Sequence, residues 1–176
     1  MRADTDYIER FIRPIPDWPV EGVVFRDITP LLNDPKAFGM TIDGIVAKVG
    51  DASISRVLGV EARGFIFAAP VAHALGAGFV PVRKPGKLPW EMEQEAYSLE
   101  YGADSLEIHV DAIRQGETVL IVDDVLATGG TAGATIRLVE RLGGRVHALA
   151  FVLELEALGG RQRLDGYDVS SLINYA

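Results

Sequence analysis

Short apolar runs alternate with helical patterns along most of the chain, and this alternation constrains the fold more than any other feature. The run Thr118–Val122 is apolar in its last four positions, which is typical of a strand buried on both faces of a sheet. Strands separated by helices indicate an α/β fold with a central parallel sheet. The other expected strands are Arg56–Val60, Gly78–Val82, Val146–Leu155 and Val169–Ile173, with helices over 35–49, Phe65–Leu75 and Thr131–Leu142.

A segment of different character lies between the second and third expected strands. Residues 85–95 are rich in proline, glycine and charge, so we expect a mobile loop there. Residues 97–110 alternate apolar and polar side chains around a central glycine, which predicts a hairpin. A loop and hairpin inserted into a compact domain are usually functional, often as a lid. The rest of the chain has neither repeats nor a linker, so we expect one domain over residues 1–176.

The composition excludes several classes of function. The net charge of -8 argues against bulk affinity for nucleic acid or for an anionic membrane, so an anionic substrate must meet a local basic cluster. The absence of cysteine excludes disulfides, thiolate metal sites and a cysteine nucleophile. The charged start of the chain does not resemble a signal peptide, and no apolar run approaches the length of a membrane span. We therefore expect a cytoplasmic protein.

The stretch VLIVDDVLATGGT, Val119–Thr131, carries the strongest functional signal. It places two adjacent carboxylates, Asp123 and Asp124, at the end of a buried strand, where they repel each other unless a cation or hydroxyl groups lie against them. The glycines that follow permit a close approach of the backbone to a ligand. The spacing matches neither the nucleotide-binding P-loop nor the dinucleotide fingerprint. The pattern instead indicates a site for a polyol or a metal–phosphate ligand.

The same stretch resembles the phosphoribosyl diphosphate (PRPP) binding motif of the type I phosphoribosyltransferases. Four further stretches resemble the adenine phosphoribosyltransferases of that group and occur in the same order, namely GVVFRDITPLL (22–32), GVEARGF (59–65), RKPGKLP (83–89) and YSLEYG (97–102). The resemblance implies a parallel sheet flanked by helices, a small N-terminal hood (about 1–33), and an inserted flexible loop and hairpin (about 84–110). It also implies purine salvage by a cytoplasmic homodimer: Mg²⁺-dependent transfer of the 5-phosphoribosyl group from PRPP to N9 of adenine, giving AMP and diphosphate.

The resemblance assigns the PRPP contacts to three segments. Asp123 and Asp124 would face the ribose hydroxyls, directly or through Mg²⁺, which otherwise contacts mainly PRPP itself. The 5′-phosphate would be held by the turn and the helix N-terminus that follow, at Ala127, Thr128, Gly129, Gly130 and Thr131. The leaving diphosphate would be held by Glu61, Ala62 and Arg63, with a cis peptide between the first two, and by the basic cluster Arg83, Lys84 and Lys87. The role of Glu61 beside a diphosphate stays open, and Arg83 would reach the site of the partner subunit.

The resemblance also assigns the base contacts. Phe25 would stack on adenine, while backbone groups of Val24 and Arg26 face the edge of the base. Glu100 would be the catalytic acid near N7 of the purine, together with the catalytic Arg63, and Tyr101 would position the base. From residue type alone a phenylalanine after two valines is more often core, and a glutamate on a hairpin is more often solvated.

Two other functions compete with this interpretation. One is a phosphoribosyltransferase for 6-oxopurines or orotate; relatives that act on 6-oxopurines carry an acid where this chain has Ala127, so the alanine favours adenine. The other is a PRPP-sensing regulator without catalytic activity. A regulator of that kind usually carries a basic DNA-binding extension, and this acidic chain has no spare length for one.

Overall fold

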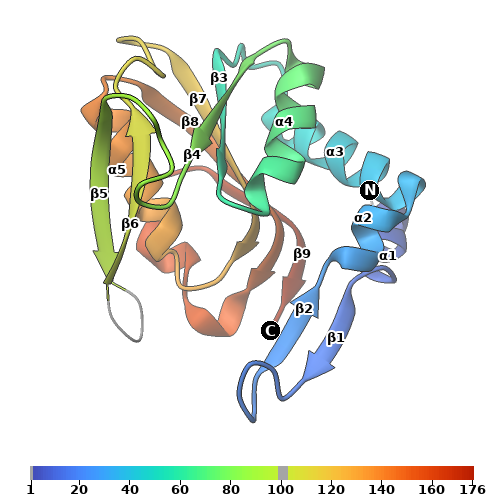
Figure 1. The fold of residues 1–176 in the computed structure, drawn as a ribbon. Coiled ribbons are helices and arrows are strands. Elements are labelled where there is room, and N and C mark those ends of the chain that lie inside the picture. Colours follow the sequence, from blue (N-terminus) through green and yellow to red (C-terminus); the bar gives the residue numbers. More distant parts are fainter. Residues whose placement is uncertain (1, 99–102) are drawn as a thin grey trace. The chain divides into compact units, whose positions relative to one another are not determined.

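The computed structural model describes residues 2–98 and 103–176 and divides into two compact units, residues 1–44 and 45–176 (Figure 1). We call them the N-terminal unit and the sheet unit. The N-terminal unit contains α1 (Arg2–Glu9), β1 (Arg13–Pro16), β2 (Val24–Asp27), α2 (Thr29–Asn33) and the first part of α3 (Pro35–Val49). The Asp34 carboxylate accepts a hydrogen bond from the Ala37 N–H (2.7 Å) and so caps α3, which has the bounds that the sequence predicts.

The sheet unit contains a five-stranded sheet with the order β4-β3-β7-β8-β9, in which every neighbouring pair is parallel. The predicted α/β architecture is therefore confirmed. Its core is formed by buried aliphatic side chains of the central strands and by Phe67 and Phe151. The strands and helices are β3 (Arg56–Val60), α4 (Gly64–Leu75), β4 (Gly78–Val82), β7 (Thr118–Leu126), α5 (Gly130–Arg141), β8 (Arg145–Leu155) and β9 (Val169–Tyr175), with 3-10 turns η1 (Glu156–Leu158) and η2 (Arg161–Leu164).

The order of the strands fixes where the helices lie. The connection from β3 leads outward to β4, and the connection from β7 leads the other way to β8. Because such crossovers are right-handed, α4 and α5 cover opposite faces of the sheet (Figure 1). The carboxyl ends of β3 and β7, which pair as neighbours, form the point where the winding reverses. In sheets of this kind ligands bind at that point.

Two predicted strands end too early: β9 continues to Tyr175 instead of ending at Ile173, and the larger difference is in β7. We expect β7 to end at Val122, whereas it continues to Leu126 and includes both aspartates. The extension has a non-local cause, because Asp123, Val125 and Leu126 pair with residues of β8. The prediction of a strand that stops before the acids is therefore wrong, while the helix after the turn begins at Gly130, one residue earlier than expected.

The inserted hairpin is confirmed in its described part. It consists of β5 (Met92–Ser98) and β6 (Ala103–His109), which pair antiparallel beside α5 (Figure 1). The prediction of a loop as far as Glu95 is wrong for residues 92–95. Glu95 lies in β5 and accepts a hydrogen bond from Arg137 Nε (2.6 Å) of α5, and it also pairs with Arg141. The acids of this segment therefore belong to a strand that docks on a helix.

None of the helices within residues 2–98 and 103–176 has the length and apolar character needed to cross a membrane.

Candidate active site at the carboxyl edge of the sheet

Two loops of the sheet unit meet where the winding reverses. The first, Glu61-Ala62-Arg63, joins β3 to α4, and the second, Ala127-Thr128-Gly129, joins β7 to α5. The strands that precede them pair in register, with Gly59 opposite Val122. The two segments that the sequence assigns to diphosphate and to 5′-phosphate therefore lie at one edge of the sheet.

The second loop ends in a tight turn that starts α5. Gly129 has a φ of 78° and caps the helix, and its carbonyl accepts the Gly133 N–H (2.9 Å). A Cβ atom at Gly129 would lie 2.7 Å from the carbonyl oxygen of Gly160, so glycine is required for space as well as for conformation. The turn leaves the first amides of α5 at the carboxyl edge of the sheet. Such a helix N-terminus attracts anions, and phosphate above all.

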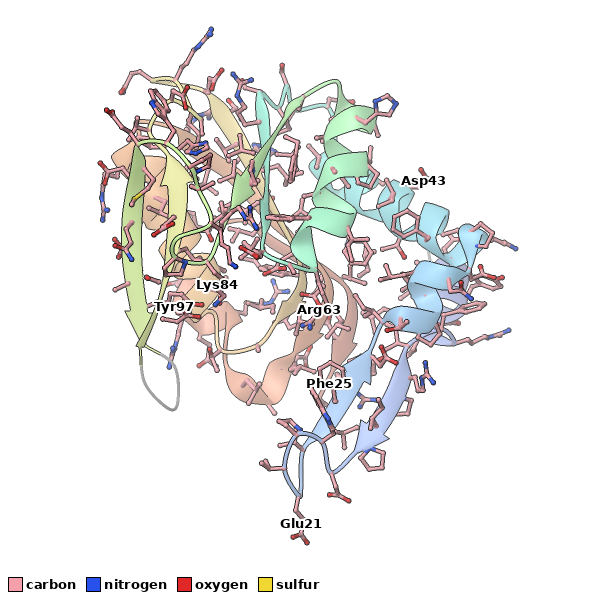
Figure 2. All side chains as sticks on the ribbon, in the orientation of Figure 1. Glu21, Phe25, Asp43, Arg63, Lys84 and Tyr97 are labelled. Carbon is pink, nitrogen blue, oxygen red and sulfur yellow. The ribbon has the colours of Figure 1, made fainter. Side chains whose placement is uncertain are left out.

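The two aspartates contact the first loop. Asp124 is 5% exposed and forms an ion pair with Arg63, whose side chain is about half exposed at the start of α4 (Figure 2). Asp123 accepts a hydrogen bond from the Asp124 N–H (2.9 Å). A Cβ atom at Gly64 would lie 2.7 Å from Asp123 Oδ1, so the glycine lets this carboxylate approach the backbone of α4. The structure thus brings Arg63 close to Asp123 and Asp124, which follow it by 60 and 61 positions in the sequence. The three residues were predicted to belong to one site.

Among the described residues, the two carboxylates Asp123 and Asp124 face a single positive charge, that of Arg63. Burial raises the pKa of Asp123 well above its ordinary value, and the neighbouring Asp124 carboxylate raises it further. Arg63 opposes the shift less strongly, because its guanidinium pairs with Asp124. Hydroxyl groups or a cation placed against Asp123 would stabilise its ionised form. The arrangement suits a ligand that supplies hydroxyls or carries a metal ion.

The first loop contains the cis peptide that the sequence comparison predicts, between Glu61 and Ala62. The Glu61 carboxylate turns toward the end of β4, where it accepts hydrogen bonds from Arg83 Nε (3.1 Å) and from the Lys84 N–H (3.0 Å). The hydrogen bond from Arg83 holds the pKa of Glu61 below its ordinary value. Glu61, whose role the sequence leaves open, thus fixes the basic segment against the loop.

The basic cluster is largely paired with acids. Arg83 also donates to the Lys87 carbonyl (3.3 Å). Lys84 forms an ion pair with Asp104 and donates to the Tyr97 hydroxyl (3.1 Å), beside the hairpin (Figure 2). Burial alone would lower the pKa of Lys84, but these partners raise it above its ordinary value. Lys87 is exposed.

Three of the predicted base contacts, Val24, Phe25 and Arg26, lie in the N-terminal unit. Phe25 is opposite Ile15 in the β1–β2 pair, and its ring meets Trp18 edge-on with centroids 4.4 Å apart. Val24 and Arg26 are opposite Pro16 and Pro14, which have no N–H to donate. The ladder bonds must therefore come from the alternate pairs, which directs the backbone groups of Val24 and Arg26 to the free edge of β2. Glu100 and Tyr101 lie outside the described residues.

The phosphate turn is supported by a segment that was not predicted from the sequence, the loop after β8. Gly160, between η1 and η2, touches the carbonyl of Ala127, and a Cβ there would lie 3.0 Å from the Gly129 nitrogen. The next residue, Arg161, pairs with the buried Glu154 at the end of β8. The available signal was the pair of adjacent glycines Gly159-Gly160, which follows the apolar strand pattern after three residues.

Comparison with known proteins identifies relatives over nearly the whole chain. The family model described as phosphoribosyl transferase domain matches residues 32–174. The adenine phosphoribosyltransferase of Thermotoga neapolitana is 58% identical over 168 residues, which cover 96% of this chain and 99% of the relative. The enzyme of that name from Escherichia coli K12 is 56% identical over 166 residues, covering 94% and 91%.

Solved structures give the same result. The adenine phosphoribosyltransferase of Thermoanaerobacter pseudethanolicus superposes with a TM-score of 0.94 at 53% identity, covering 97% of this chain and 99% of that one. The enzyme of that name from Saccharomyces cerevisiae, in complex with an imino-altritol bisphosphate and adenine, superposes with a TM-score of 0.92 at 39% identity, covering 98% and 99%.

Proposed function

The chain belongs to the adenine phosphoribosyltransferase family, and we propose that the residues at the carboxyl edge of the sheet carry out the reaction of this family in the roles given below. The reaction transfers the 5-phosphoribosyl group of PRPP to adenine and gives AMP and diphosphate. The observation that carries the assignment is the ion pair between Arg63 of the first loop and Asp124 of β7, at the edge of the sheet where both loops lie. A phosphorylated sugar needs anion donors and hydroxyl acceptors side by side, and this edge supplies both.

Asp123 and Asp124 accept hydrogen bonds from the ribose hydroxyls. Their unbalanced charge in the free protein supports this role, because hydroxyl donors stabilise a desolvated carboxylate. The 5′-phosphate lies at the N-terminus of α5 and receives hydrogen bonds from the amides and hydroxyls of the turn. Its ligands are Ala127, Thr128, Gly129, Gly130 and Thr131.

The bond from C1′ to the diphosphate oxygen breaks with its electron pair on the leaving group, while the N9 lone pair forms the new bond to C1′. The proton that N9 loses passes to the leaving diphosphate or to water. The developing ribosyl cation and the leaving anion are the charges that the enzyme must stabilise. Arg63 and the amides of Glu61 and Ala62 hold the diphosphate, helped by Arg83, Lys84 and Lys87. Glu100, from the sequence resemblance, acts as the acid near N7.

Mg²⁺ fits the donors at this edge only as an ion shared with the substrate. Within the described residues no group of three or more histidine, cysteine, aspartate or glutamate side chains could hold a metal. Mg²⁺ commonly takes one or two carboxylates and completes its shell with phosphate oxygens and water. Asp123 and Asp124 are the carboxylates that would serve, and the ion would neutralise charge on the diphosphate.

The N-terminal unit supplies the base contacts, and residues 1–33 form a hood over the base. A backbone carbonyl of Val24 or Arg26 at the free edge of β2 accepts the 6-amino group of adenine, Phe25 stacks on the ring, and Tyr101 positions it. The same carbonyl would oppose the oxygen of a 6-oxopurine, which costs about 1–3 kcal/mol per unsatisfied buried group. The sequence resemblance further supports a cytoplasmic homodimer in which Arg83 reaches the partner's site.

One assay tests the function. Purified protein is supplied with PRPP and Mg²⁺ together with adenine, hypoxanthine, guanine or orotate in turn, and nucleotide and diphosphate are measured. We expect AMP from adenine alone, and no product once a chelator removes the metal. Comparable use of hypoxanthine would overturn the proposed readout of the base by the backbone. The absence of product with every base would favour the PRPP-sensing regulator.

A further inference from the structure

The phosphate turn rests on a second loop that takes no part in the reaction described above. This loop comprises η1, Gly159-Gly160 and η2, and it follows β8. Gly160 touches the Ala127 carbonyl, and the Gly160 carbonyl limits the space at Gly129. Backbone therefore lies directly on backbone, and the shape of the phosphate turn depends on where Gly160 is held.

An ion pair between Arg161, which is partly open to solvent, and the buried Glu154 holds the residue next to Gly160. Arg161 Nε donates to Glu154 Oε1 (3.0 Å), and Arg161 Nη2 pairs with Glu154 Oε2. Arg161 also donates to the Val169 carbonyl (2.6 Å) and to Ser171 Oγ (3.2 Å) of β9, and Ser171 Oγ donates to Glu154 Oε2 (2.8 Å). Glu154 is only 3% exposed. The guanidinium is thus fixed by two strands at once.

Glu154 also connects to the turn through its backbone. In the β7–β8 ladder it pairs with Leu126, the last strand residue before Ala127. The contacts form a closed ring, from Leu126 to Glu154, to Arg161 and Gly160, and back to Ala127 and Gly129. The Glu154 carboxylate neutralises the Arg161 guanidinium. Arg161 therefore stabilises the loop and does not itself bind the phosphate.

We propose that Arg161 and Glu154 are positioning residues for the 5′-phosphate: their ion pair sets the conformation of the Ala127–Gly129 turn without contact to the substrate. The proposal rests on the proposed function, since it takes this turn as the phosphate site. A displacement of about 1 Å in a positioning group can cost on the order of 100-fold in rate, so a modest shift of Gly160 is enough to matter.

The test compares Arg161→Gln, Arg161→Lys, Glu154→Gln and the double variant Arg161→Gln/Glu154→Gln. Arg163→Gln is the matched control, because it removes an exposed arginine from the same 3-10 turn. We expect the KM for PRPP to rise about tenfold or more in Arg161→Gln while the KM for adenine stays unchanged. Arg161→Lys should recover part of the loss, and the double variant should be no worse than the poorer single variant, since both remove the same ion pair.

Calorimetric binding separates this role from a general loss of folding and from direct contact with the diphosphate. Ribose 5-phosphate should bind more weakly to Arg161→Gln than to the wild type, whereas inorganic diphosphate should bind equally well to both. Unchanged kinetic constants with a lower yield of active protein would reduce the pair to a purely structural role and overturn the proposal. If Arg161→Gln does not fold, the same comparison on Arg161→Lys decides. Failure of the wild type itself to bind ribose 5-phosphate would instead overturn the proposed function.

Discussion

The neighbouring strands β7 and β8 both carry acids near their carboxyl ends, at the same edge of the sheet, but the surroundings of these acids differ. On β7, Asp123 and Asp124 stand next to each other and share one arginine, and the pKa of Asp123 is raised. On β8, Glu154 has an arginine of its own and a serine hydroxyl, and the hydrogen bond from Arg161 lowers its pKa. Both groups lie near the carboxyl end of a strand. They differ in exposure, because Asp123 is partly exposed while Asp124 and Glu154 are buried, and they differ in their partners.

The difference separates an acid that serves the fold from acids that serve a ligand. Glu154 finds its charge partner within the chain, so it stabilises the free protein. Asp123 lacks sufficient compensation among the described neighbours, so its ionised form is stabilised only when a ligand arrives. Perturbed carboxylates of this second kind are typical of functional sites. Three experiments test whether the two kinds of acid behave differently.

The largest expected difference is in turnover. Asp124→Asn and Asp123→Asn should each lower kcat/KM for PRPP about 100-fold, because they remove charge from the ribose contact and, for Asp124, from Arg63. Glu154→Gln should leave kcat at saturating PRPP close to that of the wild type. Steady-state kinetics with both substrates varied measures the contrast, and Asp111→Asn, an exposed acid of the sheet unit, serves as the control. Full activity of both β7 variants would remove the ribose-binding role.

The second difference is in the stability of the free protein near neutral pH. Glu154→Gln should lower the free energy of unfolding by about 1–3 kcal/mol, because it leaves Arg161 without its charged partner. Asp123→Asn should raise it by about 0.5–1 kcal/mol by relieving repulsion, while its amide oxygen still accepts the Asp124 N–H. Denaturant unfolding followed by circular dichroism gives both values. Changes of the same sign in the two variants would contradict the comparison.

The smallest difference is in the pH dependence of those changes. The folded protein retains the proton on Asp123 to a higher pH than the unfolded chain does. The free energy of unfolding therefore falls as the pH rises from 3.8, the ordinary pKa of the group, through its raised pKa in the folded protein. For Glu154 the folded pKa lies below the ordinary 4.5, so its contribution is complete above that value and is lost only as the pH falls below it.

Unfolding measured from pH 4 to pH 8 therefore distinguishes the two acids. The benefit of Asp123→Asn should grow as the pH rises from 3.8 and level off above the raised pKa of Asp123, whereas the deficit of Glu154→Gln should stay constant above pH 4.5. A deficit of Glu154→Gln that varied strongly between pH 5 and pH 8 would show that the ion pair with Arg161 is not the main source of its effect.

Local signals in the sequence account for most of the elements. Arg56–Val60 and Gly78–Val82 are strands with the predicted bounds, and Gly76 closes α4 in the left-handed conformation as its position predicts. These elements are determined by apolar runs and by glycine, whose effects act within a few residues. Within the candidate site, the motif predicts that Arg63 and Asp124 belong together, and they form an ion pair.

The errors involve partners distant in the sequence. Residues 92–95 look like a charged loop because the arginines that neutralise their acids, Arg137 and Arg141, are more than 40 positions away. The length of β7 depends on its ladder with β8. Arg161 looks like an ordinary exposed charge until the fold brings it to Glu154. In each case a pattern read along the chain contains no information about the partner.

The contact between Gly129 and Gly160 also limits how this protein can diverge over generations. A methyl group at either position would meet backbone atoms, which cannot rotate aside as a side chain can. No single substitution elsewhere relieves such a clash, so neither glycine can be replaced while the other loop stays in place. Replacement of either glycine in evolution would require both loops to move together. We expect the two glycines to change rarely and together, and libraries built to alter the base preference should keep both fixed while varying the N-terminal unit.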